Sequence, residues 1–274
     1  MSGRSGRAHA VIHLRRVPLR RTDEGGFPFS VPAIRALEAL AFETPLTFLV
    51  GENGSGKSTF LEALAIVTGL PAVAQAAPRD DETLVAQRRL AAALTLSWSH
   101  RTHRGFFLRA EDFFGFARYL SSERDQMRRR LAELDEEYRD RPAHAKALAK
   151  GPIQASLADA ERRYGDLDAR SHGQAFFRVF QNRFVPGGLY LLDEPETPLS
   201  PQSQLGLVVL LKEMVEREAQ FVIATHSPIL LAVPGAAIFD FDQVPVARVA
   251  WDDLEHVRLT REFLNDPQRF LRRL

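Results

Sequence analysis

The chain has 274 residues, of which 45% are hydrophobic and 26% are charged, a composition that excludes a collagen-like or largely disordered chain. Its net charge of +1 gives no bulk attraction to nucleic acid or to a membrane. The chain contains no cysteine, which excludes disulfides, thiolate nucleophiles and Cys-ligated metals.

The sequence shows no sign of membrane insertion or export. No stretch approaches the ~18 consecutive apolar residues of a membrane-spanning helix. The N-terminal residues lack the apolar run of a signal peptide. We therefore expect a cytoplasmic protein.

The first part of the chain alternates short apolar runs with turn-rich segments. Residues 10–17 have strand character, and residues 46–50 (LTFLV) form an apolar run that indicates a buried strand. A helix pattern follows over 57–66. The other elements expected here are a loop at 71–82, strands at 94–99 and 105–109, and a helix at 111–120.

Charge dominates residues 121–141, which contain six Arg and seven Asp or Glu. Four apolar residues recur there at spacings of four, three and four, and so place one apolar stripe on a charged helix: Met127, Leu131, Leu134 and Tyr138. We expect Pro142, Gly151 and Pro152 to interrupt this pattern before a second helix near 153–164. A surface helical hairpin packed on the body is favoured over a coiled coil, because the heptads run for under two repeats.

The last third alternates strands and helices. A strand is expected at 189–192, a helix at 201–218 and another strand at 221–225. This alternation predicts an α/β fold with a mainly parallel sheet and flanking helices. We expect one domain over residues 1–274, with a small helical subdomain at 118–184 that includes a charged arm at 121–165.

Residues 51–58 (GENGSGKS) fit the phosphate-loop pattern G-x-x-x-x-G-K-[ST] without a mismatch. The expected strand before the loop and helix after it supply the context that the pattern needs. The glycines let backbone N–H groups point inward and form an anion site at a helix N-terminus. Lys57 is expected to reach the β- and γ-phosphates, and Ser58 to bind Mg²⁺.

Two carboxylates follow the strand at 189–192. Asp193 is delivered at the carboxyl end of that strand, next to the phosphate loop in a parallel sheet, where it can hold Mg²⁺. Glu194 points to the other side of the strand end and can accept a proton from an attacking water. His226 ends the next strand and can hydrogen-bond the γ-phosphate and orient the water.

Residues 171–184 (SHGQAFFRVFQNRF) begin a helix. Ser171 and Gln174 fit a capping box, which is sufficient to explain both residues. The alternative is that Ser171, Gly173 and the helix N-terminus bind a phosphate.

The order of these elements resembles that of the ABC-type ATPases. In this resemblance 51–59 is Walker A, SHGQ at 171–174 is the signature segment, 189–194 is Walker B and His226 is the switch histidine. The sequences around Walker B (DEPE…LSP) and His226 (ATHSP) are similar to those of soluble ATPases that are labelled AAA family and are related to the RecF, SMC and OLD ATPase heads. Ser200 stands where transporter ATPases carry an Asp. The ATP-binding residues that the resemblance implies are Gly51, Glu52, Asn53, Gly54, Ser55, Gly56, Lys57, Ser58, Thr59, Ser171, Gly173 and Gln174.

The resemblance also implies a mechanism. Two protomers sandwich two ATP molecules, so that Ser171 and Gly173 of one chain complete the site of the other. Glu194 activates the attacking water, and Lys57 and Mg²⁺ stabilise the charge that develops on the phosphate. His226 hydrogen-bonds the γ-phosphate and orients the water. Mg²⁺ is held by Ser58 and Asp193, and hydrolysis opens the homodimer.

Three functions stay open at this point. The first is an ATPase that drives a conformational switch on nucleic acid, or in a repair or defence assembly. Six Arg at 4–21 can touch phosphates there, although a solvated basic tail is the favoured explanation for them. The second is the ATP-binding subunit of a transporter, and the third is a regulatory module that binds ATP and a protein partner with little turnover.

Overall fold

The computed structural model describes residues 11–21, 25–73, 84–164 and 172–272. A six-stranded sheet with the order β5-β6-β7-β3-β8-β9 forms its centre. All neighbouring strands are parallel except β8 and β9. The strands are β3 (Leu46–Val50), β5 (Gly105–Arg109), β6 (Leu189–Asp193), β7 (Gln220–Ala224), β8 (Ala237–Asp240) and β9 (Ala247–Val249). The predicted α/β fold with a mainly parallel sheet is confirmed.

The central strands explain why the sheet forms here. Every residue of β3, β6 and β7 is buried, as the continuous apolar runs of a doubly covered parallel sheet require. Successive side chains point to opposite faces, so Phe48 and Tyr190 pack in one core, and Leu49 and Leu191 pack in the other.

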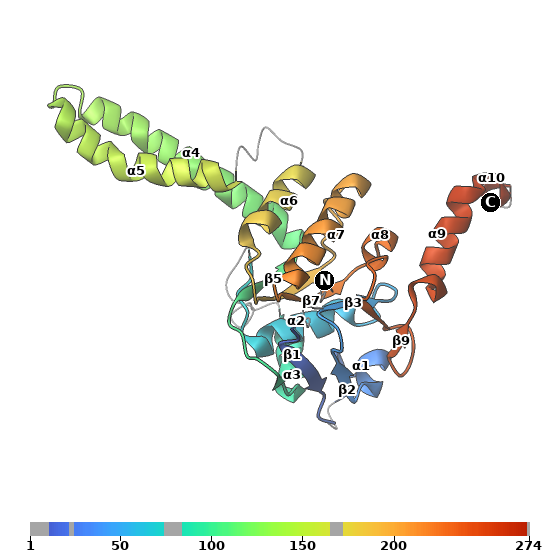
Figure 1. Ribbon diagram of the computed structural model, residues 1–274. Helices are drawn as coiled ribbons and strands as arrows, with labels where there is room; N and C mark the ends of the chain where they lie inside the picture. The colour runs from blue at the N-terminus through green and yellow to red at the C-terminus, as the bar shows by residue number, and fades with distance from the viewer. Residues whose placement is uncertain (1–10, 22–24, 74–83, 165–171, 273–274) are drawn as a thin grey trace, which may run out of the picture.

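Helices cover both faces of this sheet (Figure 1). Apolar residues of α2 (Lys57–Thr68) and α3 (Val85–Ala93) fill one core. Those of α6 (His172–Arg183), α7 (Pro201–Glu216) and α8 (Pro228–Leu231) fill the other. The sheet is therefore the middle layer of three, with both faces closed to water.

A second, antiparallel sheet has the order β2-β1-β4. It consists of β1 (Leu14–Pro18), β2 (Ala39–Ala41) and β4 (Ser97–Trp98), and the short helix α1 (Pro32–Ala36) precedes β2. The predicted strands at 10–17 and 94–99 correspond to β1 and β4, but both are shorter than expected. Neither α1 nor β2 was predicted, because Gly and Pro surround them.

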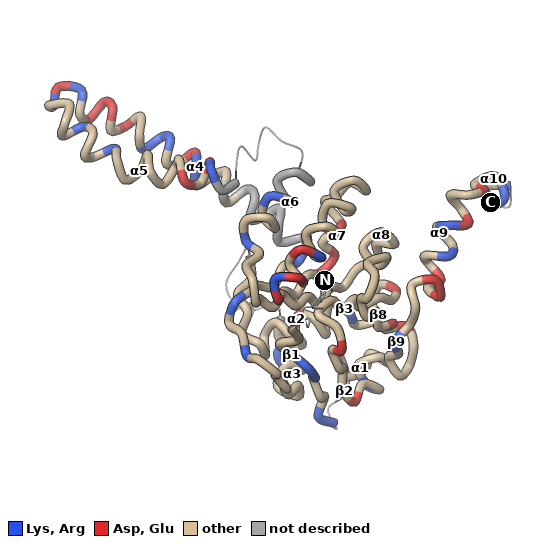
Figure 2. Tube along the Cα trace, viewed as in Figure 1, with Lys and Arg blue, Asp and Glu red and all other residues tan. Residues whose placement is uncertain are grey.

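The charged segment forms a helical hairpin of α4 (Ala110–Glu137) and α5 (Ala143–Tyr164). The hairpin projects from the domain, so the prediction that it packs on the body is wrong (Figure 1). The predicted helix at 111–120 and the charged helix are one continuous helix. Figure 2 shows the charges distributed along both helices.

The predicted interruption at Gly151 and Pro152 is also wrong, because Pro152 lies inside α5. Proline costs a helix one hydrogen bond and a steric clash, so tertiary contacts have to offset it. Lys146 and Lys150, in the turns before Pro152, both lie 2.8 Å from the Asp135 carboxylate of α4. These ion pairs hold that part of α5 against its partner helix.

The chain ends in a segment for which no elements were predicted. After β8 and β9 come a short 3-10 helix (Trp251–Asp253), α9 (Glu255–Asn265) and α10 (Pro267–Leu271). The α9 and α10 helices extend away from the sheet (Figure 1). Within the described part of the chain, no helix has the length and apolar character needed to cross a membrane.

Candidate active site

The predicted site residues come from three strands that lie side by side. The order β6-β7-β3 brings the carboxyl ends of these parallel strands together. The phosphate loop leaves β3, Asp193 ends β6, and His226 follows β7. Ala224 of β7 pairs with Leu49 on one side and with Asp193 on the other, which fixes the three strand ends in register.

Three glycines shape the loop between β3 and α2. Gly51, Gly54 and Gly56 have φ of 141°, 87° and 103°, a region that L side chains rarely adopt. At Gly51 a Cβ would also lie 2.8 Å from the Oγ of Ser55. Gly56 is the residue before the first turn of α2, so the loop leads directly into a helix N-terminus that favours anions.

Lys57 is enclosed by the loop that precedes it. Its side chain is buried, and Nζ donates hydrogen bonds to the backbone oxygens of Gly51 at 2.6 Å and Glu52 at 2.9 Å. Burial lowers the pKa of Lys57, whereas the nearby carboxylates of Asp242 and Asp193 favour its charged form. The ammonium is therefore held by loop carbonyls among acidic groups.

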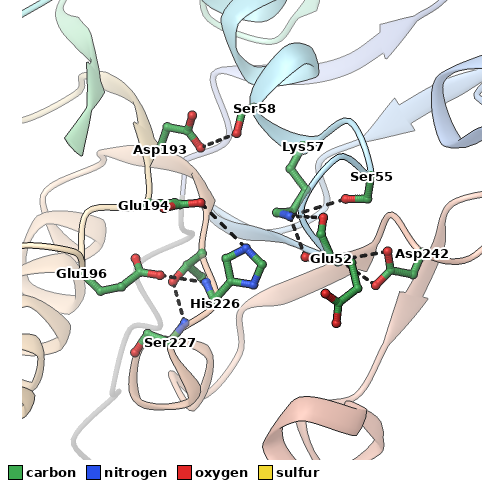
Figure 3. A network of polar contacts seen from close by, with 12 residues as sticks. Glu52, Ser55, Lys57, Ser58, Asp193, Glu194, Glu196, His226, Ser227 and Asp242 are labelled. Carbon is green, nitrogen blue, oxygen red and sulfur yellow. Dashed lines mark hydrogen bonds and ion pairs between the residues drawn. The ribbon is translucent and has the colours of Figure 1, made fainter. Parts of the chain in front are cut away.

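Asp193 and Ser58 meet between β6 and α2. The Ser58 Oγ donates a hydrogen bond to the Asp193 Oδ1 at 3.1 Å (Figure 3). Asp193 is 8% exposed, and burial raises its pKa to about 7. The charges of Glu62 and Glu194 also raise this pKa, whereas the Ser58 hydrogen bond and the charge of Lys57 lower it. A hydroxyl and a carboxylate oxygen are donors that suit Mg²⁺, and a divalent cation would favour the ionised Asp193.

Glu194 adopts an unusual backbone conformation directly after Asp193. Its φ is 49°, in the left-handed region that a non-glycine residue seldom occupies, and such residues cluster at functional sites. The Glu194 N–H donates to the oxygen of Ala224 at 2.9 Å, which ties the turn to β7. The side chain faces His226, with 3.8 Å between Glu194 Oε1 and His226 Nε2 (Figure 3).

Glu196 fixes the segment that carries His226. Its Oε1 accepts the His226 N–H at 2.8 Å, and burial raises the pKa of this carboxyl. Ser227 then caps α8 by accepting the Leu230 N–H at 3.1 Å. Glu196 was not predicted as a site residue, although it stands two positions after Glu194 in the same DEPE motif.

A pocket of about 510 Å³ opens beside the Asp193 and Ser58 pair. Glu62 of α2 and Arg109 of β5 lie 3.2 Å apart in its lining, and their side chains are only 10% and 13% exposed. The Gln87 side-chain amide donates to the second Glu62 oxygen at 2.8 Å. Glu62 and Arg109 were missed because they lie 47 positions apart and match no motif.

The signature segment is described only in part. Ser171 lies outside the described residues, so its capping box and its phosphate contact stay predictions. Gly173 and Gln174 belong to the first turn of α6, in agreement with a helix that starts here. The side chain of Gln174 is not among those described.

Two family models match the segments that supply this site. A model described as "AAA domain" matches residues 29–87, which include the phosphate loop, Ser58 and Glu62. A model described as "AAA domain, putative AbiEii toxin, Type IV TA system" matches residues 179–232, which include Asp193, Glu194 and His226. The two segments that supply the site are thus similar to AAA domains. No curated protein matched the sequence.

Solved structures that the chain resembles include two SMC head domains and the ATP-binding cassette of an ABC transporter. The SMC head domain of Pyrococcus furiosus, bound to the C-terminal domain of ScpA, has 12% identity and a TM-score of 0.44 over 92% of this chain and 99% of that one. The SMC head domain of Thermotoga maritima has 15% identity and a TM-score of 0.42, with 87% and 99% covered. A nucleotide-free ATP-binding cassette of an ABC transporter has 16% identity and a TM-score of 0.46, with 94% and 97% covered.

Proposed function

We propose that the chain is a P-loop NTPase of the ABC/SMC type, which binds Mg²⁺·ATP and hydrolyses the bond between the β- and γ-phosphates. The observation that carries the proposal is the meeting of two pairs at adjacent strand ends. Ser58 with Asp193, and Glu194 with His226, lie beside a glycine-rich loop that opens a helix.

The loop at 51–59 binds the phosphates in this proposal. Its backbone N–H groups and the N-terminus of α2 supply partial positive charge. Lys57 exchanges its hydrogen bonds with the oxygens of Gly51 and Glu52 for bonds to phosphate oxygens. Because Lys57 is buried, its charge acts in a medium of lower dielectric than water.

Ser58 and Asp193 hold the magnesium ion that accompanies ATP. When bound, Mg²⁺ neutralises charge on the phosphate oxygens. The raised pKa of Asp193 supports this assignment, because a buried carboxylate needs a cation to stay ionised near neutral pH.

Glu194 is the proposed general base. Its carboxylate takes a proton from water while the water oxygen forms a bond to the γ-phosphorus and the bond to ADP breaks. His226 faces Glu194 and orients the water and the γ-phosphate. Glu196 keeps His226 in place through its hydrogen bond to the His226 backbone N–H.

We further propose that ATP joins two copies of the chain. In this arrangement Ser171, Gly173 and Gln174 of one copy contact the ATP bound by the Walker residues of the other, and hydrolysis separates the copies. The chain then acts as one domain over 1–274, with 118–184 as the helical part that presents the signature segment. The support is the order of the motifs along the chain and the helix that begins at His172.

The test is Glu194→Gln, which removes the base and keeps the size of the side chain. We expect ATP turnover to fall by at least ~10²-fold, since a positioned base contributes ~10²–10⁴-fold. The affinity for Mg²⁺·ATP should stay within about twofold of the parent, and light scattering should show a dimer only with Mg²⁺·ATP. Glu213→Gln is the matched control, because Glu213 is exposed on α7.

Each part of the proposal can be refuted by a different result. Parental turnover in Glu194→Gln would remove Glu194 as the base. Tight ATP binding without dimer formation would limit the proposal to hydrolysis within a single chain. Absence of ATP binding by the parent protein would overturn the proposed function itself.

A further inference from the structure

The turn that follows β8, the strand beside β3, carries a carboxylate that contacts the phosphate loop. β8 runs parallel to β3, and Val50 is paired with Asp240. The N–H of Phe241 then donates to the oxygen of Val50 at 2.8 Å. The chain therefore leaves β8 alongside the point where the phosphate loop leaves β3.

Asp242 reaches the first turn of this loop. The N–H of Glu52 points at its carboxylate, with 2.9 Å to Oδ1 and 2.8 Å to Oδ2 (Figure 3). A Cβ at Gly51 would lie 3.1 Å from the same Oδ1, so the carboxylate packs directly against the glycine. The two residues are 190 positions apart in the sequence.

Asp242 is itself held in place by its neighbours. Its N–H donates to Oδ1 of Asp240 at 2.9 Å, and Oδ2 of Asp240 accepts the side-chain amide of Gln243 at 3.2 Å. The turn after β8 is therefore fixed by side-chain hydrogen bonds of its own. Asp242 thus approaches the loop from an ordered segment of backbone.

Asp242 and Lys57 act on the same turn of the loop. Lys57 Nζ donates hydrogen bonds to the backbone oxygens of Gly51 and Glu52. Asp242 accepts the Glu52 N–H, which lies between those two oxygens along the backbone. The negative charge of Asp242 is also the strongest of those that favour the charged form of Lys57. The turn is therefore held by two charged side chains of opposite sign.

We propose that Asp242 is a positioning residue for the nucleotide, which orders the 51–52 turn so that the loop binds phosphate without rearrangement. The inference rests on the proposed function. Asp242 acts through the loop and not on the reacting atoms, so its loss should weaken ATP binding and leave the chemical step unchanged. The essential feature is its hydrogen-bond acceptor, because the negative charge alone would repel a triphosphate.

Asp242→Ala and Asp242→Asn separate these two features. Alanine removes the acceptor and the charge, whereas the asparagine amide oxygen can still accept the Glu52 N–H. We expect Asp242→Ala to raise the KM for ATP at least fivefold with kcat within twofold. Asp242→Asn should keep KM within twofold of the parent. Asp253→Asn, which changes an exposed acid in the 3-10 helix, should leave both constants unchanged.

A second readout needs no nucleotide. Amide hydrogen exchange of a peptide that covers 51–56 should be faster in Asp242→Ala than in the parent and in Asp242→Asn, with equal thermal unfolding temperatures for all three. Parental exchange and parental KM in Asp242→Ala would overturn the inference and leave the proposed function standing. Equal impairment of both variants would also overturn it, because the charge would then be the essential feature. A parent protein that does not bind ATP would contradict the proposed function, while hydrogen exchange would still decide whether Asp242 orders the loop.

Discussion

The pKa of Asp193 makes the stability of the ligand-free protein depend on pH. Burial raises this pKa from the ordinary 3.8 to about 7, a difference of about 3 pH units. The folded protein therefore holds this proton more tightly than the unfolded chain does. The stabilisation is fully present below about pH 4 and is lost as pH rises through about 7. At about 1.4 kcal/mol for each pH unit, the ionised carboxylate costs the folded protein about 4 kcal/mol above that range.

Asp193→Asn removes the titration and keeps an oxygen that can accept the Ser58 hydroxyl. We expect the variant to become more stable relative to the parent as pH rises, by about 3 kcal/mol between pH 5 and pH 8. The assay is urea unfolding of both proteins in EDTA at several pH values, and the difference between them cancels all other titrations. The same variant should lose Mg²⁺-dependent ATP hydrolysis.

A difference in the free energy of unfolding that stays constant from pH 5 to pH 8 would refute the reasoning, because it would show that Asp193 has an ordinary pKa. Asp253→Asn serves again as the control with an exposed acid, and its difference from the parent should not change with pH. If the free energy of unfolding of Asp193→Asn minus that of the parent decreases as pH rises, the pKa of Asp193 is lowered and not raised.

Two further predictions concern the loop and the buried ion pair. Gly51→Ala should weaken ATP binding at least tenfold in titration calorimetry with an unchanged circular dichroism spectrum, since the added Cβ meets Ser55 Oγ at 2.8 Å and φ is 141°; parental affinity would show that the loop adjusts freely. Arg109→Ala should lower the free energy of unfolding by about 3 kcal/mol, because it breaks a buried ion pair with the Glu62 carboxylate. The double variant Arg109→Ala, Glu62→Gln should recover part of that loss in urea unfolding. If its free energy of unfolding is equal to or lower than that of Arg109→Ala, the pair is not the cause of the loss.

The sequence was sufficient for the central strands and the residues at their ends. β3 is a continuous apolar run, and β5 and β6 each contain an apolar run that ends at a charged residue. The glycine pattern at 51–56 specifies a loop that few backbones can form. Because parallel strands present their carboxyl ends at one edge, the sequence predicted Asp193 next to the phosphate loop, and its carboxylate does contact Ser58.

Other features depend on partners that are distant in the sequence. β2, which was not predicted, has only three residues, and its pairing with β1 makes it a strand. Pro152 lies inside α5, and the two lysines in the preceding turns pair with Asp135 of α4, a partner that no local pattern marks. Asp242 contacts the phosphate loop only because β8 lies beside β3, and no local pattern marks that neighbour.

The continuous α4 helix has a mechanical consequence. It starts at Ala110, directly after Arg109 in the pocket beside Asp193, and runs for 28 residues into the projecting hairpin. At ~1.5 Å per residue its length is about 42 Å. A tilt of about 10° at the base, pivoting at the pocket, would sweep the far end through about 7 Å. A small displacement at Arg109, which leaves the sheet unchanged, can thus produce a movement at the far end of the hairpin that is larger than a side chain.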